Sequence, residues 1–151
     1  MNDLSIKSKE LFERGFSCSE SVVRAAQELS YIDSALDMGT LNKIASPFSG
    51  SMGGSGCVCG AVAGAQIVIG LVFGRTAPDE DPNNVKEISR DLAERFKDKR
   101  KAICCRVLTA KHKDPVSRRQ NCTEIVGDAA GILYNLIKEN APEVKPFLEV
   151  S

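Results

Sequence analysis

The sequence contains no tryptophan, only two tyrosines and a single histidine, and it has no excess charge of either sign. With so few aromatic side chains, a surface on which nucleic-acid bases stack is not expected. Twenty Lys and Arg residues balance twenty Asp and Glu residues, so no surplus positive field draws the chain toward a phosphate backbone or an anionic membrane. We therefore expect a protein that does not bind nucleic acid.

Long apolar runs are also missing. The longest stretch without charge covers residues 44–74, and its apolar part, 61–73, has 13 residues and is interrupted by Gln66 and Gly70. A bilayer core needs about 20 apolar residues, so the sequence does not predict an integral membrane protein. The charged residues 1–16 lack the apolar core of a secretory signal, which predicts a cytoplasmic location.

The composition, 42% hydrophobic and 26% charged, is typical of one ordinary globular domain, and no linker or repeat divides residues 1–151. Apolar residues recur with helical spacing, as at Val85, Ile88 and Leu92, whereas no comparable run alternates with period two. The sequence predicts an all-α, single-domain bundle of six or seven helices around a central buried helix at 58–73. The predicted helices cover residues 3–14, 18–30, 40–46, 58–73, 83–98, 100–109 and 121–139.

Against this background, six cysteines are the unusual feature of the chain. In a reducing compartment they indicate metal ligands, redox centres or buried small side chains more than a permanent disulfide framework. The spacing excludes a thioredoxin-type Cys-x-x-Cys site and a zinc-finger quartet. His112 has no partner in the sequence, so a Cys–His hydrolase is not favoured.

Three cysteines are predicted to lie at helix starts. Ser17 precedes Cys18 as a capping residue, a Gly/Ser loop over 46–56 leads to Cys59, and Asn121 precedes Cys122. The helix dipole and unpaired backbone N–H groups favour a thiolate at such positions. Cys104 and Cys105 lie between basic residues, which predicts a similar effect there.

Glycine spacing adds a structural expectation around Cys59. Gly56, Gly60 and Gly64 recur every four residues, so one face of the predicted helix lacks side chains. This face either lets a neighbouring segment approach closely or leaves room for a second sulfur, a cluster or a small substrate.

The order of these motifs resembles the C_GCAxxG_C_C family of redox-active proteins. The most specific part is residues 59–64, CGAVAG, which is similar to the family's CGAxxG element, and the likeness spans nearly the whole chain. The resemblance implies a small helical protein with a redox-active site at Cys18, Cys59, Cys105 and Cys122. Cys57 and Cys104 do not match the family pattern, and each neighbours a cysteine that does.

Three functions are compatible with these cysteines. The first is thiol–disulfide exchange or electron transfer, as in a thiol–disulfide oxidoreductase, with Cys59 as nucleophile and with Cys57 and Cys104 as resolving thiols. Its partner would be a redox protein or a small thiol or disulfide, and homo-oligomerisation is left open. The second is an iron–sulfur or other metal site held by the same four cysteines, 18, 59, 105 and 122. The third is a non-enzymatic helical module in which the cysteines fill space.

The redox and metal hypotheses both require separated segments to meet. We predict that the sulfurs of Cys18, Cys59, Cys105 and Cys122 form one cluster. Cys57 or Cys104 would lie near its rim, and the loop at 53–56 would cover it.

Overall fold

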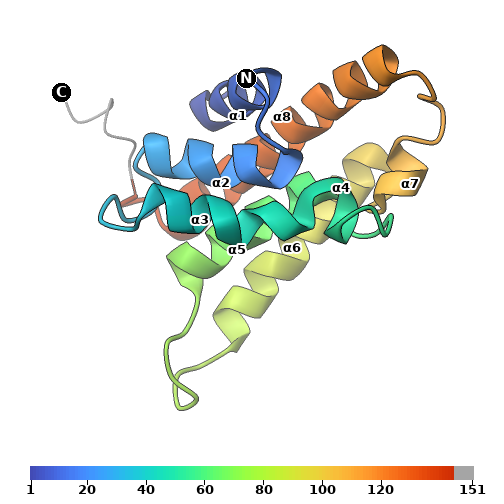
Figure 1. The fold of residues 1–151 in the computed structure, drawn as a ribbon. Helices are drawn as coiled ribbons and strands as arrows, with labels where there is room; N and C mark the ends of the chain where they lie inside the picture. The colour runs from blue at the N-terminus through green and yellow to red at the C-terminus, as the bar shows by residue number, and fades with distance from the viewer. Residues whose placement is uncertain (145–151) are drawn as a thin grey trace.

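The computed structural model describes residues 1–144, and within them every regular element is a helix (Figure 1). Six helices have eight residues or more, which confirms the predicted all-α class. They are α1 (Asp3–Glu13), α2 (Cys18–Glu28), α3 (Met38–Ala45), α5 (Gly60–Phe73), α6 (Asn83–Arg100) and α8 (Pro115–Asn140). Three short elements connect them: η1 (Ser46–Phe48), α4 (Ser49–Met52) and α7 (Cys105–Leu108).

Two predicted helices differ from the observed ones. The helix expected at 100–109 is reduced to α7, because α6 continues to Arg100 and Lys101 then takes a left-handed φ of 67° that ends it. The helix expected to begin at Asn121 begins at Pro115, where Asp114 caps the first turn through its bond to the Ser117 N–H. Pro at the first helical position and Asp before it are a strong start signal.

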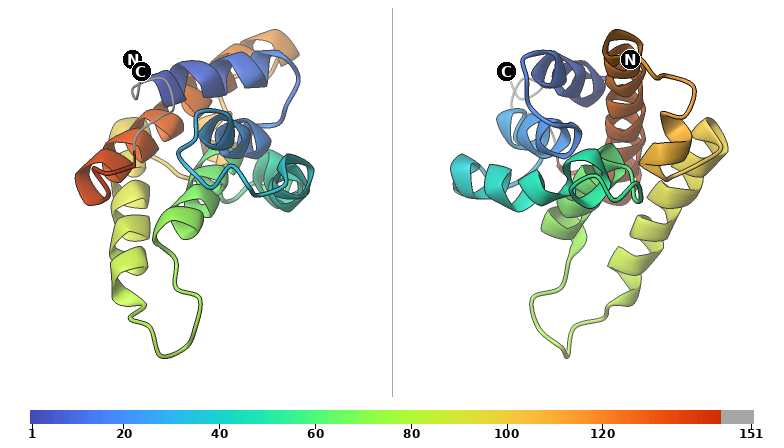
Figure 2. Two further views of the ribbon diagram at one scale, coloured as in Figure 1. Left: turned by 90° about the vertical axis from the view of Figure 1, so that its left-hand side faces the viewer. Right: turned by 45° about the vertical axis from the view of Figure 1, so that its right-hand side comes forward.

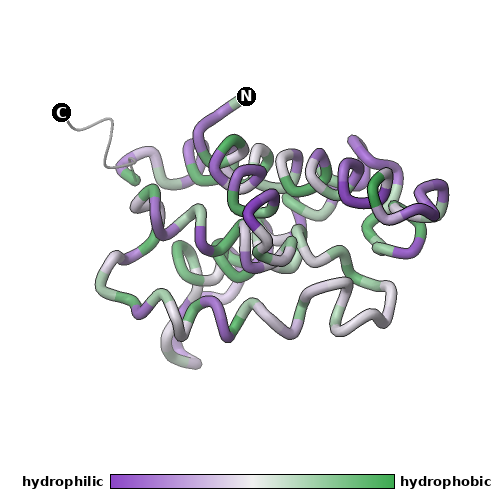
Figure 3. The backbone as a smooth tube through the Cα atoms, turned by 45° about the horizontal axis from the view of Figure 1, so that its top comes forward, coloured by the Kyte–Doolittle hydropathy of each residue, from purple (hydrophilic) through white to green (hydrophobic). Residues whose placement is uncertain are grey.

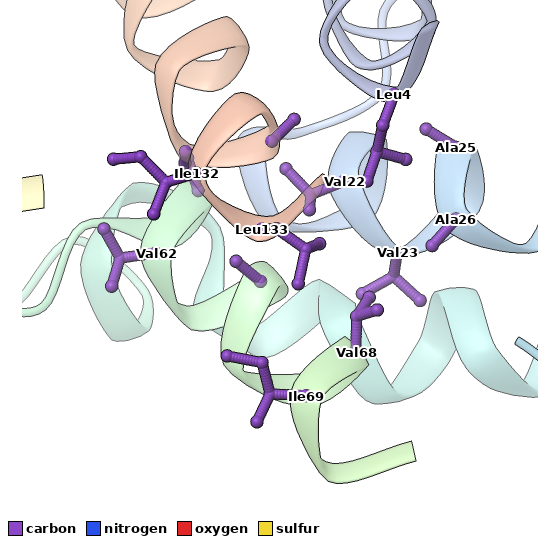
Figure 4. Close-up of a cluster of buried hydrophobic side chains, with 14 of the residues drawn as sticks. Leu4, Val22, Val23, Ala25, Ala26, Val62, Val68, Ile69, Ile132 and Leu133 are labelled. Atoms are coloured by element: carbon purple, nitrogen blue, oxygen red, sulfur yellow. The ribbon is translucent and has the colours of Figure 1, made fainter. Parts of the chain in front are cut away.

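The hydrophobic core lies where α1, α2, α5 and α8 meet. Leu4 of α1, Val22 of α2 and Leu133 of α8 are fully buried, and Figure 4 shows them gathered in one cluster with side chains of α5. Along the tube of Figure 3, hydrophobic and hydrophilic stretches alternate on most of the helices, as expected for helices with one buried face. Truncating a buried leucine such as Leu133 to alanine would cost about 2–5 kcal/mol.

Helix α5 contacts α2, α6 and α8, which explains why it is apolar on several faces. Its burial is nevertheless uneven. Ala61, Val62 and Val68 are buried, whereas Gly70 and Leu71 are exposed, Leu71 by 41%. The prediction of a central helix that is buried all round is therefore not confirmed, and the core is shared among four helices.

The second half of α5, the connection 74–82 and the first half of α6 project from the rest of the molecule as an arm (Figure 2). The first turns of α5 and the last turns of α6 lie at the body of the molecule (Figure 2). The start of α5 is close to α4, and the end of α6 is close to α7. No helix in residues 1–144 combines the length and the apolar character needed to cross a membrane.

Candidate functional site

Cys18 is the first residue of α2, as predicted, and a capping box fixes its position. The Ser17 hydroxyl accepts a bond of 3.3 Å from the Glu20 N–H, and the Glu20 carboxylate accepts one of 3.1 Å from the Ser17 N–H. The neighbouring Ser19 hydroxyl is buried and donates to the Ala45 carbonyl at 2.8 Å. These bonds hold the first turn of α2 against α3 and leave the Cys18 side chain half-buried.

The glycine face of α5 packs directly on this turn. A Cβ atom at Gly60 would lie 2.3 Å from the Cys18 Sγ atom and 2.8 Å from the Phe48 carbonyl oxygen. A Cβ atom at Gly64 would lie 2.6 Å from the Ser19 carbonyl oxygen. The bare face predicted from the glycine spacing is thus used for close packing, and part of what it accommodates is a cysteine sulfur.

The loop before α5 folds back toward Cys18. The backbone of Gly50 donates a hydrogen bond to the Cys18 sulfur, and Gly50 itself has a φ of 63°, a left-handed conformation that favours glycine. Gly56 has a φ of 95° and packs against the Arg106 side chain. A Cβ atom added to Gly56 would lie 3.4 Å from the Cβ atom of Arg106. Residues 50–56 therefore contact both the α2 start and the segment that carries Cys104 and Cys105.

Cys57 and Cys104 form a disulfide, and their Cα atoms are 4.2 Å apart. The two segments also share two backbone hydrogen bonds, from Cys59 N–H to the Ile103 carbonyl at 2.8 Å and from Arg106 N–H to the Gly56 carbonyl at 3.2 Å. Neither Cys57 nor Cys104 is a free thiol in this state. The resolving roles expected of them would require this bond to open first.

The disulfide and the two backbone hydrogen bonds bring the segments that carry Cys59 and Cys105 next to each other. Cys59 is the residue that precedes α5, and Cys105 is the first residue of α7. Since Cys57 and Cys104 are bonded, the two free thiols that flank the bond belong to neighbouring segments of backbone.

Cys122 lies two turns inside α8 rather than at a helix start, because α8 begins at Pro115. The predicted stabilisation of its thiolate by a helix N-terminus is therefore wrong. Asn121, expected to cap the helix, instead donates its side-chain amide to the Leu108 carbonyl at 3.0 Å. This bond ties α8 to α7 beside Cys122. His112 bonds to the Ser117 hydroxyl at 2.7 Å rather than to a cysteine.

The four free cysteines influence one another electrostatically. A negative charge on Cys105 raises the pKa of each of the other three free thiols, which are Cys18, Cys59 and Cys122. A charge on Cys18 likewise raises the pKa of Cys59 and of Cys122. Cys105 is thus the residue whose charge affects the pKa of all three other free thiols.

Burial dominates the protonation of these thiols. It raises the pKa of Cys59 to about 12, although the N–H groups of Ala61 and Val62 donate hydrogen bonds to the sulfur and oppose the shift. Burial also raises the pKa of Cys18 and of Cys122 above the ordinary value of a thiol. The prediction that a helix start makes Cys59 a thiolate is therefore wrong, because desolvation outweighs the helix dipole.

Within residues 1–144, no three side chains of His, Cys, Asp or Glu are grouped closely enough to hold a metal ion. Electrostatic influence extends over a Debye length of about 8–10 Å, whereas zinc requires each sulfur at about 2.3 Å from the ion. The four thiols influence one another's pKa without being grouped in this way. The metal hypothesis for the cysteines at 18, 59, 105 and 122 has no such grouping to support it.

A comparison with family models agrees with the cysteine pattern. The model described as "Putative redox-active protein (C_GCAxxG_C_C)" matches residues 16–136. The chain belongs to this family. No curated protein and no solved structure matches the chain.

The disulfide separates the six cysteines into the two groups expected from the resemblance. The four cysteines expected to match the family, at positions 18, 59, 105 and 122, are free thiols, and the other two form the disulfide. Sequence analysis left the pairing open, yet it contained a usable signal. Each extra cysteine neighbours a family cysteine, so bringing Cys59 and Cys105 together also brings Cys57 and Cys104 together.

Proposed function

We propose that this member of the C_GCAxxG_C_C family carries out thiol–disulfide exchange through Cys18, Cys59, Cys105 and Cys122 acting as one site. The observation that carries the proposal is the shared electrostatic influence of Cys105 on the other three free thiols. Thiols whose charges affect one another lie in the same part of the molecule, as exchange among them requires. The family match supports redox activity in general.

The chemistry would proceed in two steps. A thiolate of the site attacks one sulfur of a substrate disulfide, a mixed disulfide forms, and one half of the substrate leaves as a thiol. A second cysteine of the site then attacks the protein sulfur of that mixed disulfide and releases the other half. Two protein thiols are oxidised to a disulfide and the substrate is reduced to two thiols, so electrons and protons balance.

Accessibility suggests how the roles are divided. Cys18, Cys105 and Cys122 are half-buried, whereas Cys59 is only 5% exposed and its pKa is raised to about 12. Substrate access favours an initial attack by one of the half-buried thiols. Cys59 is therefore not expected to make the first attack, and we assign the resolving step to Cys105, whose charge influences all three other free thiols.

The test starts from full-length protein with the Cys57–Cys104 disulfide formed and four thiols free. The protein is treated with 2-hydroxyethyl disulfide, and free thiols and intact mass are followed with time. We expect thiols to disappear in pairs, with a mass loss of about 2 Da per pair and recovery with dithiothreitol. The Cys105→Ser variant should instead accumulate stable mixed disulfides.

The matched control is the double variant Cys57→Ser/Cys104→Ser, which lacks the structural disulfide and keeps the four family cysteines. It should still oxidise in pairs. If the wild-type thiols react independently and retain their adducts, or do not react, the four cysteines do not form an exchange site. Iron and sulfide bound in stoichiometric amounts in anaerobically purified protein would also contradict the proposal.

A further inference from the structure

A cavity of about 300 Å³ lies beside Cys122. It is formed between the first two turns of α8 and the end of α1, and its lining residues are Phe12, Pro115, Arg118, Arg119 and Cys122. Small-molecule sites have volumes from about 300 to 1,000 Å³, so this pocket suits a small ligand or part of a larger one. It gives a ligand direct access to one sulfur of the four-thiol site.

The pocket lies in the most basic part of the chain. Residues 97–119 contain nine of the 20 Lys and Arg residues but only two of the 20 Asp and Glu residues, Asp98 and Asp114. Asp128 of α8 pairs with Lys99 and Arg100, which neutralises part of this charge. Arg106, Lys111 and Lys113 are exposed in the same region. A field of this kind attracts anionic ligands and accelerates their association.

The two arginines of the pocket have different roles. Arg119 is held in place, since it donates a hydrogen bond to the Phe12 carbonyl and its guanidinium lies 4.3 Å from the centre of the Phe12 ring. Arg118 is exposed, and within residues 1–144 its side chain makes no hydrogen bond or ion pair. Its guanidinium is therefore free to bind a carboxylate, which it matches in geometry.

We propose that this pocket binds one half of a small disulfide that carries carboxylate groups, with Arg118 holding a carboxylate next to the Cys122 sulfur. This inference rests on the proposed exchange function and names its substrate class. Phe12 and the Pro115 ring supply apolar walls for the rest of the bound half. Arg119, fixed by Phe12, adds a second positive charge at the rim.

The reaction at this pocket balances as follows. The Cys122 thiolate attacks the nearer substrate sulfur, the substrate S–S bond breaks, and the outer half leaves with the bonding electrons and takes up a proton. Cys122 then carries the inner half as a mixed disulfide. The Cys105 thiolate attacks the Cys122 sulfur, forms the Cys105–Cys122 disulfide and releases the inner half as a second thiol.

The experiment compares three disulfide probes on the reduced four-thiol form of the full-length protein: oxidised glutathione, which is anionic, 2-hydroxyethyl disulfide, which is neutral, and cystamine, which is cationic. The rate of first adduct formation at Cys122 is measured by mass spectrometry in the Cys105→Ser background, which traps the adduct. Rates are divided by those of a model thiol with the same probe. We expect the normalised rate to be highest for oxidised glutathione, by about tenfold over cystamine at low salt, and to converge at high salt.

Arg118→Ala tests the role of the pocket. Because Arg118 is exposed, this variant is expected to fold normally. It should slow the reaction with oxidised glutathione about three- to fivefold more than the reaction with the neutral probe, as for loss of one exposed ion pair. Some slowing of both is expected, because the Arg118 charge lowers the pKa of Cys122. Lys113→Ala, which removes an exposed cation outside the pocket lining, is the matched control and should change neither rate by more than about twofold.

The outcomes separate this inference from the proposed function. If the wild-type protein oxidises in pairs with the neutral probe but shows no preference for the anionic one, or if Arg118→Ala and Lys113→Ala behave alike, the substrate assignment is overturned and the exchange function stands. If no probe oxidises the thiols, the exchange function itself is contradicted. First adducts at Cys18 instead of Cys122 would also overturn the pocket assignment.

Discussion

The α-carbon of Gly60 faces the Cys18 sulfur so closely that a Cβ atom there would lie 2.3 Å from it. The first turns of α2 and α5 are therefore in contact. Helix α2 contributes the Cys18 sulfur, and α5 contributes the backbone of Gly60. This contact means that a side chain at position 60 and the sulfur of Cys18 cannot both occupy this space. The glycine provides the space in which the cysteine is held.

Gly60→Ala should therefore force the α2 start away from α5. We expect a loss of about 1–3 kcal/mol in the free energy of unfolding, typical of overpacking, together with faster alkylation of Cys18. Gly70→Ala is the matched control, because a Cβ at Gly70 meets nothing within 4 Å. It should be neutral or stabilise the protein by up to about 1 kcal/mol, since alanine favours a helix over glycine. Urea denaturation compares the two, and equal stability would refute the packing argument.

Cys59 should resist alkylation well into alkaline solution. With its pKa raised to about 12 by burial, the folded thiol stays protonated at pH 9, where an unfolded thiol of pKa about 8.5 is mostly ionised. We expect the native thiol to react with iodoacetamide about a thousandfold more slowly than the same thiol in unfolded protein at this pH. A rate for native Cys59 equal to that of the unfolded chain would show that the sulfur is accessible and ionised.

The same shift makes stability depend on pH. The fold favours the protonated thiol of Cys59, so the stabilisation is complete below the unfolded pKa of about 8.5 and is lost as pH rises toward 12. The free energy of unfolding of the four-thiol form should fall over this range. The fall should be smaller in Cys59→Ala, when both proteins are followed by denaturant titration at a series of pH values.

Opening the Cys57–Cys104 disulfide should destabilise the protein. The bond closes a loop with a sequence separation of 47 residues. For a loop of this length the chain-entropy estimate is about 4 kcal/mol, and measured effects are often smaller. Cys57→Ser/Cys104→Ser should therefore unfold at lower denaturant concentration than the wild type, by about 2–4 kcal/mol. Adding reductant should lower wild-type stability to that of the variant, and no change on reduction would contradict the prediction.

Uneven burial of α5 predicts two different responses to the same change. Val68 is fully buried, so Val68→Lys places an unpaired charge in the core and should prevent folding. Leu71 lies on the same helix but is 41% exposed, so Leu71→Lys should fold and lose less than about 1 kcal/mol. Circular dichroism and thermal melts distinguish these outcomes. Failure of both variants to fold would mean that α5 is buried all round, and normal folding of both would mean that Val68 is not in the core.

Much of the fold could be predicted from local sequence patterns. The starts of α1 at Asp3 and α2 at Cys18 agree with apolar periodicity and capping residues, and the start of α6 at Asn83 agrees with periodicity. The start of α8 could not be placed from periodicity, since the polar residues 117–121 look like a loop. The Asp114–Pro115 pair was the better signal, because Asp caps the helix and Pro suits its first position.

The chemical state of the site was harder to predict than its position. The helix-start argument located Cys18 and Cys59 correctly, but it predicted the wrong direction for the pKa of Cys59. Desolvation depends on segments that are distant in sequence, such as the paired residues 103–106, and no local pattern reports it. The contribution of Phe12 to the pocket beside Cys122 was likewise hidden, because α1 lies more than 100 residues away in the chain.

The covalent bond between Cys57 and Cys104 closes the base of the arm formed by α5 and α6, since one residue precedes α5 and the other follows α6. The bond therefore holds together the backbone that carries Cys59 and the backbone that carries Cys105, whatever residues form the tip of the arm at 74–82. Lengthening or shortening a surface connection costs little once its ends are fixed elsewhere. The tip of the arm can thus vary in length and sequence while the spacing of the thiols stays constant. New contacts with other molecules can arise at the tip without a change in the reactivity of the thiols.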